Sequence, residues 1–158
     1  MNSAGSLAEE PAAVSEPFLL PRDEMAFRGR YQGLLLNRQI TTVFRPGDRI
    51  WPNWRGYVEG ETVSARVIER AGCDALRVAP QFNRVRVPIR IHDLAVLSVE
   101  QLTSEDFRGS SADVFDRDSL LAHLFEIYGQ PIETYGGQVT RIRFTYAGPR
   151  WARPTRRW

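Results

Sequence analysis

A strict two-residue alternation between residues 84 and 91 is the feature that most restricts the fold of this chain. Four buried-type side chains occupy every second position, namely Val85, Val87, Ile89 and Ile91. Between them stand Arg84, Arg86, Pro88 and Arg90. Because successive side chains of a β-strand point to opposite faces, the pattern predicts a strand with one buried face and three arginines on the other. Pro88 cannot donate to a ladder, which favours an edge position or a bend there.

Further short strands and two main helices follow from the same kind of pattern. We expect strands at 25–27, 39–45, 49–51, 61–70, 95–101 and 138–146, and a hairpin whose arms are 76–78 and 84–87. Apolar spacing predicts a helix over 28–36. It also predicts a later helix, which Asp116 or Asp118 caps at its N-terminus and Gly129 ends. Thr103 or Ser104 is expected to cap the start of a further helix. Mixed short strands with two helices predict an α+β fold, a small, partly closed, mixed or antiparallel β-barrel.

The composition is that of one globular domain with two tails. The 158 residues are 42% hydrophobic and 25% charged, which is ordinary for a soluble domain. We interpret residues 1–21 as a flexible tail, 22–147 as the domain and 148–158 as a basic tail rich in Trp and Arg. No apolar run approaches the ~20 residues of a membrane-spanning helix, and the acidic N-terminus does not resemble a signal peptide. We therefore expect a cytoplasmic protein and no membrane partner.

The residue types present exclude several classes of chemistry. Cys73 is the one cysteine of the chain, so an internal disulfide and a multi-cysteine zinc site are excluded. Cys73, His92 and His123 show no ligand spacing, and we expect no metal and no cofactor. All 21 basic residues are arginines. Because arginine stays protonated near neutral pH, no mechanism that requires a lysine is available to this protein.

Charge is distributed unevenly along the chain. Residues 27–92 contain twelve arginines and five acids, whereas residues 93–147 contain four arginines and nine acids. A basic half of this kind favours a polyanion such as RNA or a nucleotide as the partner. The acidic half leaves a second alternative open, a protein-interaction domain that docks a basic partner.

The stretch from residue 34 to residue 52 joins a turn to a cluster of hydrogen-bond donors. Pro46-Gly47-Asp48 has the composition of a tight turn. The polar side chains before it suit a phosphate and a base edge, and these are Arg38, Gln39, Thr42 and Arg45. The strand arginines Arg84, Arg86 and Arg90 suit a nucleic-acid backbone, or are simply solvated. The aromatic residues that suit base stacking are Trp51, Trp54 and Tyr57, although Trp51 also fits a core position.

The order of these segments resembles that of ASCH domains, members of the PUA-like superfamily of small β-barrels linked to RNA. The opening strand at 25–27, the helix at 28–36 and the segment Asn37-Arg38-Gln39-Ile40-Thr41-Thr42 stand in the family's order. Gly47-Asp48, the late helix ending in Tyr128 and the last strand at 139–146 continue it. The resemblance covers roughly residues 24–147. It implies a PUA-like barrel that binds RNA or a nucleotide.

The same resemblance implies a hydrolase as the alternative function. One branch similar to this family removes acyl groups from modified cytidine with a lysine, a threonine and a glutamate. Carried over by position, Thr42 matches the threonine and Asp113 the acid, while Gln39 stands in the lysine's place. Glutamine neither takes a proton nor activates a nucleophile, so we expect no lysine-dependent catalysis. For a ribonuclease-like site His92 and His123 are the substitutes, although His123 also fits a structural role on the late helix.

Overall fold

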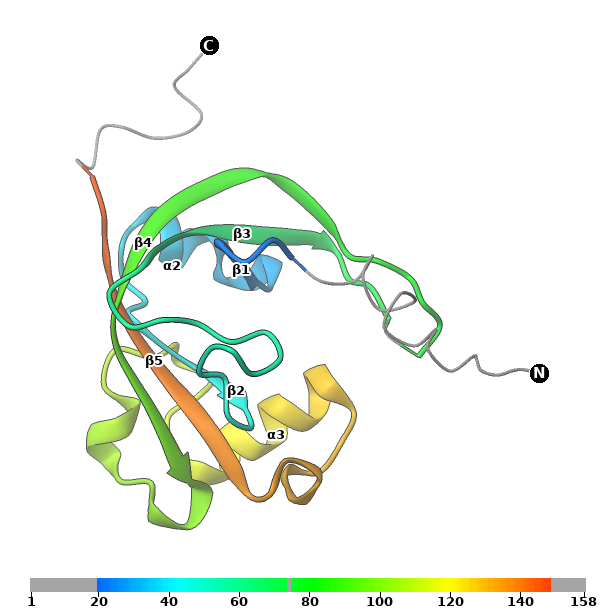
Figure 1. Cartoon of the computed structure of the whole chain (residues 1–158), viewed down its shortest axis with the longest axis vertical. Coiled ribbons are helices and arrows are strands. Elements are labelled where there is room, and N and C mark those ends of the chain that lie inside the picture. The colour runs from blue at the N-terminus through cyan, green and yellow to red at the C-terminus, as the bar shows by residue number, and fades with distance from the viewer. Residues whose placement is uncertain (1–19, 74, 149–158) are drawn as a thin grey trace.

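The computed structural model of this chain describes residues 20–73 and 75–148. Five strands form one sheet in the order β1-β3-β4-β5-β2. They are β1 (Glu24–Phe27), β2 (Thr42–Pro46), β3 (Thr62–Arg70), β4 (Gln81–Ser98) and β5 (Gln138–Tyr146). β1 pairs with β3 in parallel, and the other three pairs are antiparallel. The sheet curls into a half-barrel along the arched β4 (Figure 1), so the predicted α+β class is confirmed.

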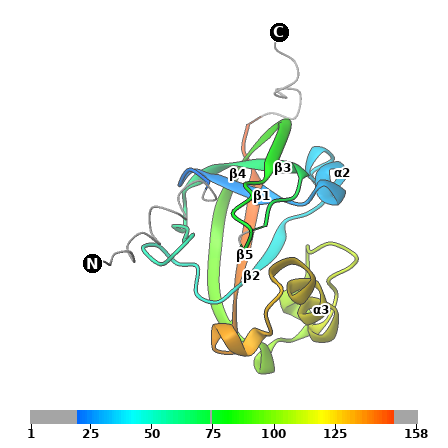
Figure 2. The ribbon, with the colours of Figure 1, turned by 90° about the vertical axis from the view of Figure 1, so that its right-hand side faces the viewer.

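Two α-helices lie on one side of this curved sheet, with β2 between them (Figure 2). They are α2 (Gln32–Leu36) and α3 (Arg117–Tyr128). The helix expected over 28–36 is divided into the 3-10 turn η2 (Gly29–Tyr31) and the single turn α2, and a glycine in each part weakens the helix. α3 starts and ends as predicted. Asp116 accepts a hydrogen bond from the Ser119 amide at 2.8 Å, and Gly129 closes the helix in the left-handed conformation.

The apolar core is divided between the two helices. Under α2, Leu35 packs with Met25 and Phe27 of β1 and with the inward side chains of β3 and β4. Under α3, Leu120 and Leu124 pack in a second cluster with strand residues and with the short helices η3 (Val99–Gln101) and η4 (Ser104–Phe107). A last short helix, η5 (Ile132–Tyr135), leads into β5. β2 therefore separates two packed regions, and each face of β2 packs into a different one.

The alternation in β4 is confirmed, but the edge position, one of the two alternatives expected from Pro88, is wrong. Val85, Val87, Ile89 and Ile91 are all buried, and β4 lies between β3 and β5. Pro88 fits inside the sheet because its carbonyl faces Ala147, whose amide donates to it at 3.0 Å just beyond the end of β5. The proline nitrogen lies on that same side of the strand, where no partner strand needs an N–H.

Two other strand predictions are wrong, and two more strands have different bounds from those expected. Segment 49–51 contributes one bridge, Ile50 to Tyr57, since the chain curls back on itself after the turn. Segment 76–78 likewise contributes one bridge, Cys73 to Val78, and β3 is the strand that pairs with β4. Segment 95–98 continues β4, and 99–101 is η3. The strand expected from residue 39 begins at Thr42, because Arg38 is left-handed with φ 57°.

Most of the two expected tails lies outside the described residues. This applies to residues 1–19 and to the whole Trp- and Arg-rich segment 149–158. Within the described ranges, no helix has the length and apolar character that crossing a membrane requires.

Candidate functional site

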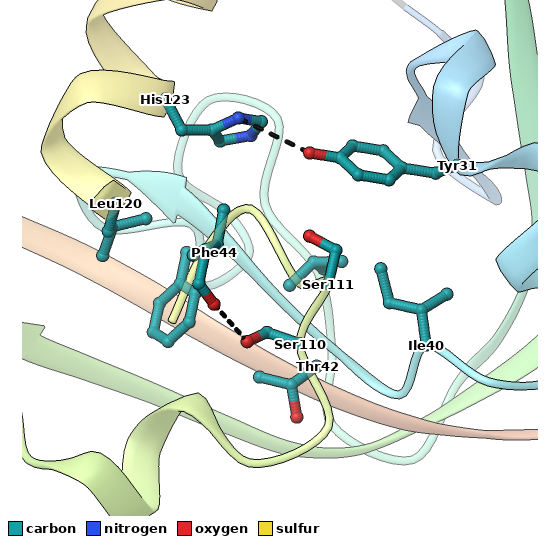
Figure 3. A pocket seen from close by; sticks show the side chains of 10 residues that line it. Tyr31, Ile40, Thr42, Phe44, Ser110, Ser111, Leu120 and His123 are labelled. Carbon is teal, nitrogen blue, oxygen red and sulfur yellow. Dashed lines mark hydrogen bonds between the residues drawn. The ribbon is translucent and has the colours of Figure 1, made fainter. Parts of the chain in front are cut away.

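A small open pocket of about 280 Å³ lies between β2, the segment 110–114 and α3 (Figure 3). Its floor is apolar and is formed by Ile40, Val43, Phe44, Val114 and Leu120. Hydrogen-bonding side chains stand around this floor, namely Tyr31, Thr42, Ser110, Ser111 and His123. Much of this volume is open to solvent, so the pocket is a shallow depression with polar edges. None of these lining side chains carries a permanent charge.

Gly109 attaches the loop that forms one wall of this pocket. Its carbonyl accepts from the amides of Thr41 and Thr42, at 2.9 and 3.1 Å. Its φ is +89°, and a Cβ atom there would lie 2.3 Å from Oγ1 of Thr41. Thr42 fixes the same loop by donating from Oγ1 to the carbonyl of Arg108 at 2.7 Å. A glycine is thus required where the loop meets the start of β2.

A polar cluster stands at the rim of the pocket. The Tyr31 hydroxyl donates to Oδ2 of Asp113 at 2.8 Å, and Ser111 donates to the other oxygen, Oδ1, at 2.5 Å. Nδ1 of His123 lies 3.5 Å from the Tyr31 hydroxyl and 3.1 Å from Nη2 of Arg30. Arg30 also pairs with Asp113 at 3.4 Å. η2, the 110–114 loop and α3 thus meet in one hydrogen-bonded group.

This environment sets the ionisation of the cluster. Burial raises the pKa of Asp113, but the bonds from Ser111 and Tyr31 and the charges of His123 and Arg30 outweigh it and leave the pKa below its usual value. Burial lowers the pKa of His123, and the charge of Asp113 offsets this only in part. Burial is also the main cause that raises the pKa of Tyr31. At neutral pH the cluster therefore offers a carboxylate, a neutral imidazole and a phenol.

Arg45 lies on the opposite face of β2 from Thr42, as the alternation of a strand requires. Its Nη2 donates to the carbonyl of Ala26 at 2.8 Å, and its guanidinium lies 5.7 Å from the centre of the Phe27 ring. Ala26 is in β1, and β1 and β2 are the two edges of the sheet. One arginine side chain therefore bridges the open side of the half-barrel.

Arg49 is almost completely buried beside it, with 4% of its surface exposed. Its guanidinium lies between two aromatic rings, 5.3 Å from the centre of Trp54 and 5.9 Å from that of Tyr128. Burial lowers the pKa of Arg49. Burial raises the pKa of Tyr128, but the charges of Arg45 and Arg49 outweigh it and leave that pKa below its usual value. Positive charge is thus concentrated here.

The structure does not bring the predicted ligand residues together as one set. Thr42 lines the pocket, and Asp113 lies at its rim. Gln39 is exposed, and Arg38 extends toward the end of β5, where it donates to the carbonyl of Gly148 at 3.1 Å and lies 5.6 Å from the Tyr146 ring centre. The Arg45 side chain lies on the other face of β2. The expected cleft formed jointly by Arg38, Gln39, Thr42 and Arg45 is therefore absent.

The remaining predicted residues are distributed over the surface. Arg84, Arg86 and Arg90 are exposed on the outer face of β4, and none of them lines the pocket. Arg86 pairs with Glu24 at 2.9 Å, and Arg66 pairs with the same carboxylate at 3.0 Å. Trp54 is half exposed over Arg49. A role of these residues in nucleic-acid binding stays a prediction.

The acidic half of the sequence is largely paired within the fold. Arg141 contacts both Asp93 and Asp106, and Arg30 contacts both Asp113 and Glu126. The other ion pairs there join Glu105 to Arg108 and Glu100 to Arg117. A basic protein partner for this half stays a prediction. Over residues 20–73 and 75–148, no group of three or more His, Cys, Asp or Glu side chains has the arrangement of a metal site.

Sequence reasoning missed Tyr31, Ser110, Ser111 and Arg49. Tyr31 belongs to the apolar stripe of its helix, so the pattern predicts a core residue there. The two serines lie in a segment predicted to be a loop. Arg49 follows directly after the Pro-Gly-Asp turn. That position was a usable signal, because a tight turn fixes the direction of the next side chain.

Together, the fold and the pocket define an α+β half-barrel domain with a small polar site beside its second strand. No family model matches the chain, and comparison with curated proteins finds no match either. Among solved structures, the chain is similar to the crystal structure of protein EF3133 from Enterococcus faecalis, described with the family model DUF984. The TM-score is 0.46 at 10% identity, over 75% of this chain and 71% of that chain. A likeness at this level carries no information about the pocket chemistry.

Proposed function

We propose that this chain is an ASCH-like, PUA-type domain that binds a nucleotide or RNA, with a base in the pocket beside Thr42. The observation that carries the proposal is the composition of that pocket, an apolar floor surrounded by uncharged donors and acceptors. A base presents flat apolar faces and a hydrogen-bonding edge, and RNA-binding proteins read single-stranded bases through both. No lysine is available, so binding without lysine-dependent catalysis remains our first hypothesis.

Arginines near the pocket support a phosphorylated ligand. Arg30 lies at the rim, bound to His123 and Asp113. Its side chain is nearly half exposed, so part of the guanidinium is open to solvent. Guanidinium groups contact phosphate oxygens in a bidentate manner. This arrangement suits a base inside and a phosphate outside the pocket.

Binding of labelled single-stranded RNA oligomers and of the four nucleoside monophosphates tests the proposal. We expect affinity that falls steeply with salt for RNA, because arginine–phosphate contacts release counterions. Tyr31→Phe and His123→Gln each remove one polar group from the pocket, and we expect each to weaken binding by about 10-fold. Thr145→Val, an exposed change on β5, is the control and should bind like the unmodified chain. Binding that is undetectable at low salt, or equal in all four proteins, contradicts the proposal.

A hydrolase acting on modified nucleosides or RNA is the second candidate, and the rim cluster is the observation that favours it. His123 has a lowered pKa and lies beside Tyr31, so it offers a neutral imidazole that takes a proton at neutral pH. Thr42 is less suited as a nucleophile because its hydroxyl already donates to the Arg108 carbonyl. Turnover of acylated cytidine or of RNA that Asp113→Ala and His123→Gln abolish would support this candidate. No turnover over such a panel would dispose of it.

A further inference from the structure

Arg49 is a buried charge with no counter-ion in the part of the chain that the structure describes. No carboxylate among those residues lies within ion-pair distance of Arg49 or Arg45, and Nη2 of Arg49 has no hydrogen-bond partner there. A buried ion without a partner costs several kcal/mol in a folded protein. Burial therefore leaves the Arg49 guanidinium with an unfilled requirement for negative charge, and the positive charge of Arg45 adds to it.

The backbone holds Arg49 in place on both sides. Its amide donates to Oγ1 of the fully buried Thr140 at 2.8 Å, and its carbonyl accepts from the amide of Tyr57 at 2.8 Å. Thr140 in turn donates to the carbonyl of Gly47 at 2.6 Å, so one side chain clamps both ends of the turn. The backbone of Arg49 is thus fixed before any ligand arrives, which lowers the entropy cost of binding.

Two phenol groups lie within the field of these arginines. Arg45 and Arg49 both oppose the effect of burial on the pKa of Tyr57, and they reverse it for Tyr128. Each phenol has an O–H donor, and that of Tyr57 makes a long contact of 3.5 Å to the carbonyl of Glu24. Neither phenol has a fixed negative charge. Guanidinium and hydroxyl groups are donors that suit a tetrahedral oxyanion.

We propose that Arg45 and Arg49, with the hydroxyl groups of Tyr57 and Tyr128, form a binding site for a phosphate group. Trp54 covers this site. Its ring lies over the Arg49 guanidinium, and the Arg55 guanidinium lies 4.2 Å from the centre of the same ring. Because 53% of the Trp54 surface is exposed, we expect this side chain to turn aside when a phosphate group reaches Arg49. The site is formed by residues other than those of the Thr42 pocket. Inorganic pyrophosphate, which has no base, is therefore expected to bind this site and not the pocket.

Titration with pyrophosphate at constant ionic strength, followed by calorimetry and by phosphorus NMR, tests the proposal. We expect saturable binding to the whole chain, weakened about 10-fold or more in Arg49→Gln, which removes charge-assisted hydrogen bonds. The matched control is Arg70→Gln, which removes the same charge from the exposed end of β3 and should bind within twofold of the unmodified chain. Equal affinity in the Arg49 variant and the unmodified chain, or an equal loss in the Arg70 variant, overturns the proposal.

Two further variants keep the test decisive if Arg49→Gln does not fold. Tyr128→Phe removes one hydroxyl group and preserves the ring, and we expect it to weaken pyrophosphate binding several-fold. Trp54→Ala removes the cover, and we expect affinity at least as high as in the unmodified chain. Unchanged binding in Tyr128→Phe together with lost binding in Trp54→Ala would assign the site to the tryptophan ring and overturn the proposal.

Comparison of pyrophosphate with a nucleoside separates this inference from the proposed function. If both are right, Arg49→Gln weakens pyrophosphate binding and leaves nucleoside binding unchanged, while Tyr31→Phe weakens nucleoside binding and leaves pyrophosphate binding unchanged. Pyrophosphate binding without any nucleoside or RNA binding rejects the nucleotide function and retains the phosphate site. Nucleoside binding without any pyrophosphate binding that depends on Arg49 rejects the phosphate site alone.

Discussion

The hydroxyl group of Tyr31 donates a hydrogen bond of 2.8 Å to Oδ2 of Asp113, which lies 82 residues further along the chain. This bond joins η2, next to β1, to the loop that precedes α3. His123 of α3 lies 3.5 Å from the same hydroxyl group. The mouth of the pocket is thus built from three separate parts of the sequence, and the ionisation of its groups is coupled.

Asp113→Asn should lower the pKa of His123 further. The charge of the Asp113 carboxylate favours the protonated imidazole and offsets part of the effect of burial. An amide in its place preserves the shape of the side chain and removes that charge. NMR titration of the His123 ring protons measures the shift, and exposed His92 in the same spectrum serves as the internal control. A His123 pKa that stays the same or rises in the variant contradicts the geometry of the cluster.

The stability of the protein should fall on mild acidification because of His123. Its folded-state pKa is lower than the ordinary histidine value of about 6.5, mainly because of burial. Between these two values the unfolded chain binds more protons than the folded one, so the free energy of unfolding decreases as the pH falls through that window. Urea unfolding of the unmodified chain and of His123→Gln, near pH 7.5 and near pH 5, measures this effect. The stability of the unmodified chain relative to the variant should be smaller at the lower pH, and a larger one would refute the assignment.

Thr140→Val should destabilise the fold by about 2 kcal/mol. The Thr140 hydroxyl accepts from the Arg49 amide and donates to the Gly47 carbonyl, and valine leaves both buried groups without a partner. Thr145→Val on the same strand is the matched control, since Thr145 is exposed and its change should alter stability by less than about 0.5 kcal/mol. Urea unfolding monitored by circular dichroism gives both values. Similar values for the two variants would show that the clamp contributes nothing.

Gly109→Ala should cost more stability than Gly60→Ala. Both glycines have a positive φ, at 89° and 96°, so both alanine variants carry backbone strain. A Cβ at Gly60 meets open space, whereas at Gly109 it would lie 2.3 Å from Thr41 Oγ1 and 2.9 Å from Thr42 Oγ1. We expect the difference in unfolding free energy to be roughly 2 kcal/mol, the typical cost of overpacking. An equal loss of unfolding free energy in the two variants would mean that the loop containing Gly109 shifts to accommodate the Cβ atom without cost.

Local patterns predicted the elements whose formation depends on short stretches of chain. The alternation in β4 and β5, and the capping of α3 by Asp116 and Gly129, needed no knowledge of distant residues. Pairing was less predictable. The central place of Pro88 depends on where β5 ends, and that boundary lies some sixty residues away in the sequence.

The candidate site was predictable only in part, for a related reason. Thr42 and Asp113 could be named because the resemblance to ASCH domains implies them by position, and both are at the pocket. Tyr31 looked like a core residue, because an apolar stripe does not show which ring has a hydroxyl group at an open edge. Arg38 and Arg45 are close in sequence, yet the left-handed turn at Arg38 and the alternation of β2 direct them to different surfaces.

The sequence by itself determined the fold class and the ends of α3, and it excluded lysine-dependent chemistry because every basic residue is an arginine. Periodicity, capping and side-chain pKa are local properties, which is why the sequence is sufficient for them. Only the tertiary structure decided which groups meet. Tyr31, Asp113 and His123 come together, and Arg49 lies buried beside Arg45, because the curled sheet closes long loops around two separate cores. Proximity of that kind is a property of the packed chain, and no short stretch of sequence contains it.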